Sequence, residues 1–149
     1  EDFKGAAGVL FPAMARLLAL TPLTGLFLSA GAQSTTQARS LIRSTGSDLP
    51  EELLRPYAKL IGMRSHIDGT LGMMAQWSLT ELNRALPQVE TRVLFLHGSK
   101  VSAVASSVSD RAASIMPNAD LLVLVGLGHL AHEEAPAQVA EAIQAFASV

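Results

Sequence analysis

The stretch from Gly126 to Glu134, with the sequence GLGHLAHEE, holds the residue types best able to do chemistry. His129 lies a few residues past an apolar run that predicts a strand, and just before a predicted helix. Loops beyond the carboxyl ends of parallel strands are where α/β proteins place ligands and catalytic groups. His129 is therefore a candidate general base within reach of a nucleophile. The alternative is a structural histidine that caps the loop or the following helix.

The other polar residues of this stretch have simpler interpretations. His132 is typical of the start of a helix and not of a second base. Glu133 and Glu134 are expected at a helix N-terminus, where carboxylates interact favourably with the helix dipole, and we interpret them as capping residues. No group of His, Asp and Glu in the chain has the spacing of a dedicated metal site, so we predict neither a metal nor a cofactor.

The sequence of the second half of the chain predicts the strands and helices that must position His129. Residues 92–97 and 119–125 are short apolar runs that end at glycines, which predicts two buried strands. Residues 103–116 and 136–147 have helical periodicity. Strand, helix, strand and helix within about 60 residues are typical of the end of a parallel sheet.

The first half of the chain predicts helices only. Apolar periodicity and helix breakers place them at residues 5–20, 22–30, 35–44, 50–60, 64–76 and 79–86. Ser47 and Asp48 are expected to cap the fourth. The predicted fold class is α/β, with a helical cap over residues 1–87 and the last two parallel strands and helices of an incomplete sheet over 88–149. Because parallel sheets need several strands, we expect the others N-terminal to residue 1, in another chain or in a swapped dimer.

The amino-acid composition limits what the protein can bind and where it can be located. The chain is 49% hydrophobic and only 16% charged, against about 25% charged in average soluble domains, so we expect apolar surface that a partner or a second copy covers. A membrane span needs about 20 consecutive apolar residues, and Pro12 and Arg16 interrupt the longest stretch, so no span is predicted. A net charge of −2 without a basic block predicts no nucleic-acid binding. The lack of a basic segment ahead of the apolar N-terminal stretch predicts a cytoplasmic protein.

The second half resembles the end of α/β hydrolases. A strand is followed by Gly98-Ser99-Lys100-Val101, a helix, a second strand, Gly128-His129 and then Glu134-x-Pro136. In that superfamily the catalytic triad runs Ser, Asp or Glu, and His along the chain. The resemblance covers all 149 residues and implies that His129 occupies the position of the triad histidine and that the helical half is a cap.

Three segments carry a narrower resemblance. GAAGVLFP at residues 5–12, GMMAQW at 72–77 and GHLAHEE at 128–134 resemble the magnesium-chelatase accessory hydrolases of bacteriochlorophyll biosynthesis. The methionine-rich block is the more specific marker, since hydrolase caps diverge strongly. This resemblance implies a capped hydrolase fold linked to tetrapyrrole metabolism, with acyl-transfer chemistry of the ester-hydrolysis type in the complete protein.

The chain departs from the hydrolase pattern where the triad acid should lie. Val101 stands at the acid position and Ala105 replaces the proline that usually follows. A valine cannot stabilise an imidazolium, and losing the acid's function can reduce turnover by about 10⁴-fold. Asp2 is an alternative acid, because it precedes the predicted cap. The simpler interpretation of Asp2 is a solvated terminal carboxylate.

The nucleophile is absent from the chain. No Gly-x-Ser-x-Gly elbow occurs, and the serines around Gly46 lie between two predicted helices instead of after a strand. We therefore expect no hydrolysis by this chain alone.

Met73, Met74 and Trp77 form an apolar cluster in the predicted cap. Such clusters are more often core than binding site. The inner face of a cap is also the roof of a pocket, where these residues would suit a flat apolar ligand such as a tetrapyrrole.

Three functions remain open from the sequence. The first is the C-terminal part of a capped hydrolase that pairs with a missing N-terminal half. The second is a non-catalytic binding or chaperone-like module, which Val101 favours. The third is a helical module that self-associates through its apolar surface.

Overall fold

The computed structural model of the chain describes residues 34–76 and 78–148. They group into two compact units. The helical unit comprises residues 34–39 and 50–79, and the sheet unit comprises residues 40–49 and 80–148. Helix α3 (Thr35–Ser44) begins in the first and ends in the second. The helices predicted at residues 5–20 and 22–30 lie outside the described residues.

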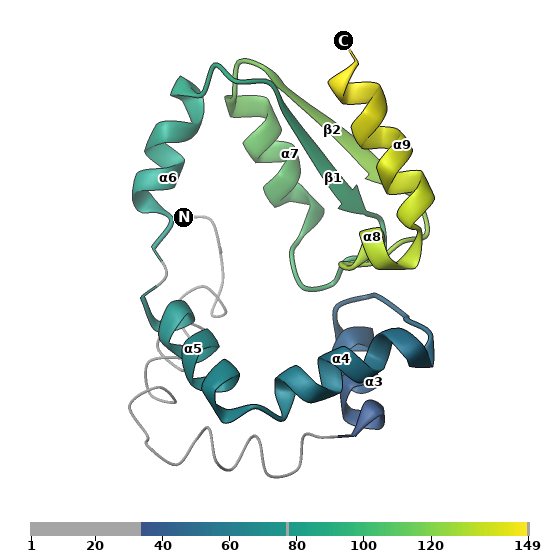
Figure 1. Cartoon of the computed structure of the whole chain (residues 1–149). Coiled ribbons are helices and arrows are strands. Elements are labelled where there is room, and N and C mark those ends of the chain that lie inside the picture. The colour runs from purple at the N-terminus through teal and green to yellow at the C-terminus, as the bar shows by residue number, and fades with distance from the viewer. Residues whose placement is uncertain (1–33, 77, 149) are drawn as a thin grey trace. The chain divides into compact units, whose positions relative to one another are not determined.

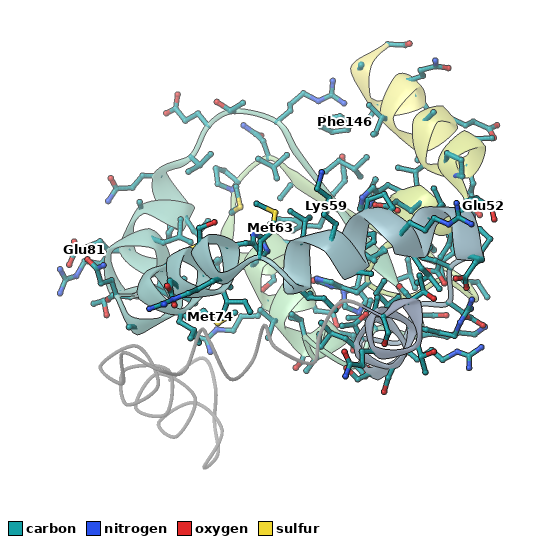
Figure 2. All side chains as sticks on the ribbon, turned by 60° about the horizontal axis from the view of Figure 1, so that its bottom comes forward. Glu52, Lys59, Met63, Met74, Glu81 and Phe146 are labelled. Carbon is teal, nitrogen blue, oxygen red and sulfur yellow. The ribbon has the colours of Figure 1, made fainter. Side chains whose placement is uncertain are left out.

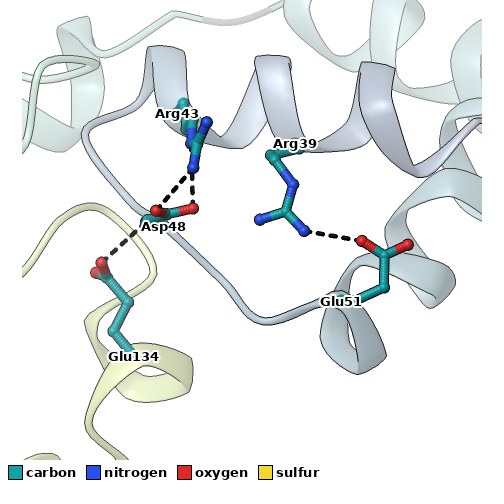
Figure 3. A network of polar contacts seen from close by, with 5 residues as sticks. All are labelled: Arg39, Arg43, Asp48, Glu51 and Glu134. Carbon is teal, nitrogen blue, oxygen red and sulfur yellow. Dashed lines mark hydrogen bonds and ion pairs between the residues drawn. The ribbon is translucent and has the colours of Figure 1, made fainter.

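The helical unit contains the start of α3, α4 (Glu51–Ile61) and α5 (Arg64–Ala75). Helix α4 begins directly after Pro50 and carries two glutamates in its first turn, as its positive N-terminal dipole favours. The buried side chains of this unit are Ala38, Leu54 and Ala58. An ion pair of 2.8 Å between Arg39 and Glu51 joins α3 to α4 (Figure 3).

The Glu51 carboxylate predicts a dependence of stability on pH. A side-chain hydrogen bond with Thr35, a second with Arg39 and the nearby arginine charges hold the pKa of Glu51 below its ordinary value of 4.5. Because the folded-state pKa is depressed, the stabilisation is fully present above the ordinary value and is lost as the pH falls through the folded-state pKa. We expect Glu51→Gln to flatten the acid limb of a plot of melting temperature against pH. Glu52→Gln, which removes the same charge one residue along the helix, is the control, and an equal flattening in both variants would contradict the assignment.

The sheet unit is built on two parallel strands, β1 (Val93–Gly98) and β2 (Ala119–Leu124). They pair in register from Val93 opposite Ala119 to Gly98 opposite Leu124. Helix α7 (Ser106–Ile115) makes the crossover between them, and α9 (Pro136–Ala147) follows β2 after the short helix α8 (Ala131–Glu134). In Figure 1, α7 and α9 flank the strand pair and α8 lies near the arrowheads. Helix α6 (Thr80–Ala85) and a 3₁₀ turn (Leu86–Gln88) lead into β1.

Polar and aromatic contacts hold the helices of this unit to its strands. His97 is buried at the end of β1, with its Nδ1 atom 3.2 Å from the hydroxyl of Ser109 on α7. The guanidinium of Arg92, just before β1, lies 4.4 Å from the ring centroid of Phe146 on α9. A cation–π contact at an exposed site contributes about 0.5–1 kcal/mol. Strands that pair in parallel through a helical crossover confirm the predicted α/β class.

The order of strands and helices is as predicted, but the predicted burial of the strands and the predicted start of one helix are wrong. The strands were expected to be buried, but Leu122 and Val123 of β2 are 42% and 47% exposed. A sheet of two strands leaves part of each face without a covering layer, which explains this exposure. The helix expected over 103–116 begins only at Ser106, and residues 103 and 104 form a bend ahead of it.

Candidate functional site

The loops that follow β1 and β2 are hydrogen bonded to each other at the carboxyl ends of the strands. The Ser99 N–H donates to the Leu124 carbonyl at 2.9 Å, and the Gly126 N–H donates to the Ser99 hydroxyl at 2.8 Å. One residue further, the Lys100 N–H donates to the Leu127 carbonyl at 2.9 Å. The turn that carries Val101 therefore lies alongside the loop that carries His129.

A third segment of the sheet unit, Thr45–Asp48 at the end of α3, packs against both loops. The Ser102 N–H donates to the Thr45 carbonyl at 3.2 Å, and the Ser102 hydroxyl donates to the Ser44 carbonyl at 2.7 Å. Gly46 has a φ of +90°, and a Cβ there would overlap the Lys100 carbonyl. A Cβ at Gly128 would overlap the Gly46 carbonyl. Backbones this close require glycine at both positions.

A glycine in close contact and a glycine in open space should respond in opposite ways to substitution by alanine. We expect Gly46→Ala to lower the free energy of unfolding by about 2–4 kcal/mol, since it adds both backbone strain and overlap. Gly69 lies inside α5, and a Cβ there would meet nothing within 4 Å. Gly69→Ala should raise the free energy of unfolding by about 0.5–1 kcal/mol. Urea titration of the variants checks both signs, and an unchanged midpoint for Gly46→Ala would contradict the packing described.

The carboxylate of Glu134, at the end of α8, joins the third segment to the histidine loop. Its Oε2 atom accepts from the Gly128 N–H at 2.6 Å and from the Ser47 hydroxyl at 3.1 Å. Its Oε1 atom accepts from the Asp48 N–H at 3.0 Å. The Asp48 carboxylate in turn accepts two hydrogen bonds from Arg43, at 3.1 and 3.0 Å (Figure 3). The network thus runs from α3 to the loop after β2.

These contacts correct two sequence interpretations. Glu133 and Glu134 lie in the first turn of α8, as expected, but α8 and α9 have no side-chain cap hydrogen bond, so Glu134 does not cap either helix. Ser47 and Asp48 were expected to cap α4, whose N-cap residue is Pro50, also without a side-chain cap bond. The Glu134 carboxylate instead accepts from the Ser47 hydroxyl and the Asp48 N–H, both more than 80 positions away in the chain, and the Asp48 carboxylate accepts from Arg43.

His129 is exposed, and within the described chain its imidazole has no hydrogen-bond partner. The backbone on either side of it is held. The Gly128 N–H donates to Glu134, and the Leu130 N–H donates to the Ser47 hydroxyl at 2.7 Å. An imidazole on an anchored loop is free to accept a proton from an incoming hydroxyl. The role of His129 as a base stays a prediction.

The other predicted site residues are placed as follows. Val101 is half-buried and its N–H donates to the Gly98 carbonyl at 3.1 Å, so the acid position carries no carboxylate. His132 is exposed, with its Nε2 atom 3.8 Å from a Glu133 oxygen. Asp2 and Trp77 lie outside the described residues.

Met73 and Met74 lie on α5 of the helical unit, where Met73 is 57% exposed and Met74 is half-buried. Figure 2 labels Met74 on this helix. A hollow of about 430 Å³ is present in the same unit. The described residues that line it are Thr35, Arg55, Ala58, Lys59, Gly62 and Met63. The predicted methionines are not among them, so their role in ligand binding stays a prediction.

Residues 34–76 and 78–148 lack two further features. No cluster of three or more His, Asp or Glu side chains in this part of the chain has the geometry to hold a metal ion. None of its helices is both long and apolar enough to cross a membrane.

The fold and loops define an α/β protein with a histidine loop at the carboxyl end of a parallel strand pair. No family model matches the chain. The chain is 40% identical over 135 residues to the magnesium-chelatase 30 kDa subunit of Rhodobacter capsulatus. The match covers 91% of this chain and 47% of the relative, so the chain spans about half the length of that protein. This similarity agrees with the resemblance to magnesium-chelatase proteins found in the three sequence segments.

Proposed function

We propose that this chain is the C-terminal part of a capped α/β-hydrolase-fold protein that acts in tetrapyrrole metabolism together with magnesium chelatase. In this proposal residues 1–87 are the cap and residues 88–149 the end of the hydrolase core. The observation that carries it is the anchored His129 loop at the carboxyl end of a parallel strand, in a chain similar to half of a magnesium-chelatase subunit. The proposed location is the cytoplasm.

The exposed strand pair supports the proposal that another segment completes the sheet. Two parallel strands leave backbone groups on their outer edges unpaired, and an isolated pair is marginally stable. Leu122, Val123 and the residue after the strand, Val125 (82% exposed), add apolar surface. A further segment, in the same or another chain, would supply more strands, the serine nucleophile and the oxyanion donors.

The chemistry we propose for the complete protein is acyl transfer. His129 takes the proton of the serine hydroxyl as its oxygen attacks an ester carbonyl, and returns that proton to the leaving alcohol. Water then releases the acyl group in a second step with the same base. With Val101 at the acid position the imidazolium formed in both steps has no carboxylate partner there, which predicts slow turnover. The ligand would be apolar and tetrapyrrole-like, with Met73, Met74 and Trp77 as candidate contacts.

A joined protein tests this function. It consists of the part of the Rhodobacter capsulatus relative outside the matched region, joined to the N-terminus of this chain. We expect the joined protein to hydrolyse a 4-nitrophenyl ester and this chain alone to do so no faster than buffer. Equal rates for the joined protein and buffer would count against a hydrolase, provided that its circular dichroism and melting show a folded protein.

A binding module without catalysis is the second candidate, and Val101 is the observation that favours it. Self-association through the exposed residues of β2 is the third. Sedimentation equilibrium of this chain distinguishes self-association from the half-enzyme. A soluble, monodisperse dimer favours self-association, whereas aggregation relieved by the added segment favours a missing half.

A further inference from the structure

We propose that Glu134 and Ser47 are positioning residues for His129 and that they couple the histidine loop to the segment Thr45–Asp48. This inference rests on the proposed function, because positioning matters only if His129 reacts. It adds two residues that the triad pattern does not contain, one of them on the loop that follows a helix of the predicted cap.

Hydrogen bonds hold the backbone on both sides of His129. The peptide N–H before it, at Gly128, donates to Glu134, and the N–H after it, at Leu130, donates to the Ser47 hydroxyl. The same hydroxyl donates to Glu134. Gly128, Glu134, Ser47 and Leu130 therefore enclose the backbone of His129 in a closed chain of hydrogen bonds, while the imidazole has no partner among residues 34–76 and 78–148.

A carboxylate suits the position of Glu134. Glu134 accepts three donors, two of them backbone N–H groups, and a carboxylate offers two oxygens without a donor. Glutamine has the same shape but one accepting oxygen, so its NH₂ group would face an N–H or O–H donor. Hydrogen bonds to an ionised acceptor are also stronger than neutral ones.

Burial also supports these roles. Ser47 is 1% exposed and Glu134 is half-buried. Water cannot easily replace a lost partner at the Ser47 hydroxyl, so removing either side chain leaves donors of the histidine loop unsatisfied. Displacement of Thr45–Asp48 would have the same effect, since it withdraws Ser47 and the Asp48 N–H together. The Arg43–Asp48 pair extends this coupling to α3.

Nuclear magnetic resonance of the full ¹⁵N-labelled chain tests the inference, with variants Glu134→Ala and Ser47→Ala, which remove the accepting groups outright. We expect amide exchange to accelerate roughly 10- to 100-fold at Gly128 in the first variant and at Leu130 in the second. We expect the order parameter of the His129 amide to fall from about 0.85 to below about 0.6 in both. Glu133→Ala removes the same side chain one residue away, where its carboxylate lies 3.8 Å from His132, and should change neither.

Amides of the strand pair separate local positioning from general stabilisation. Leu96 and Leu122 should exchange within about twofold of the unsubstituted chain in all variants if the effect is local. Unchanged exchange at Gly128 and Leu130 would overturn the inference, and so would a parallel acceleration in the strands. If the two variants loosen the histidine loop but the joined protein hydrolyses no ester, the positioning roles stand and the proposed function is refuted. If the joined protein hydrolyses the ester but neither variant loosens the loop, the proposed function stands and the positioning roles are refuted.

Discussion

Val101→Asp is expected to raise ester turnover of the joined protein by up to about 10⁴-fold, the cost of losing the acid's function in serine hydrolases of this type. Val101 ends the turn after β1, and the neighbouring Lys100 N–H donates to Leu127, two residues before His129. A carboxylate at position 101 would therefore start from a turn bound to the histidine loop. It would fix the imidazole tautomer and stabilise the imidazolium.

The control for this prediction is Val101→Asn, which matches aspartate in size and carries no charge. We expect its rate to stay near that of the unsubstituted joined protein. If Val101→Asp gives no gain, Asp2→Asn decides what supplies the acid. A large loss on that substitution assigns the role to Asp2, and no loss leaves the protein without an acid and favours the binding module.

His129→Ala is expected to remove the activity gained by Val101→Asp, a loss of about 10²- to 10⁴-fold in kcat. In the protein with valine at position 101 the same substitution should cost less, because residues that act as one unit have strongly non-additive effects. Rates of the two single variants and the double variant, measured with the same ester, check this.

His132→Ala is the matched control, since it removes an exposed histidine three residues away. It should leave the rate unchanged. Equal losses for His129→Ala and His132→Ala would mean that the stretch as a whole is needed for folding and that His129 is not the base.

The elements of the sheet unit were predictable because their signals are local. The apolar run 92–97 and the amphipathic pattern of 136–147 correspond to β1 and α9 within one residue at each end. Periodicity depends on neighbours a few positions apart, so it survives without knowledge of the tertiary fold. The similarity to a magnesium-chelatase subunit likewise followed from short segments such as GMMAQW.

The network around Glu134 was not predictable in this way. Ser47 and Glu134 are 87 positions apart, and each has a plausible local role at a helix start, as Ser and Glu commonly do. The only local trace of this network is the pair of glycines, Gly46 and Gly128, whose close approach the structure shows. Without the fold, a glycine beside a helix end indicates only a turn. The exposure of Leu122 was missed for a related reason, since an apolar strand does not reveal how many strands cover it.

The most direct test of the central claim is labelling of the joined protein by a fluorophosphonate, which reacts with a serine activated by a neighbouring base. We expect one adduct, located by mass spectrometry on a serine of the added segment, with a labelling rate that falls at least about tenfold on His129→Ala and not on His132→Ala. A folded joined protein with no adduct, or with one that forms equally fast without His129, would contradict the assignment of this chain as the histidine-bearing part of a hydrolase.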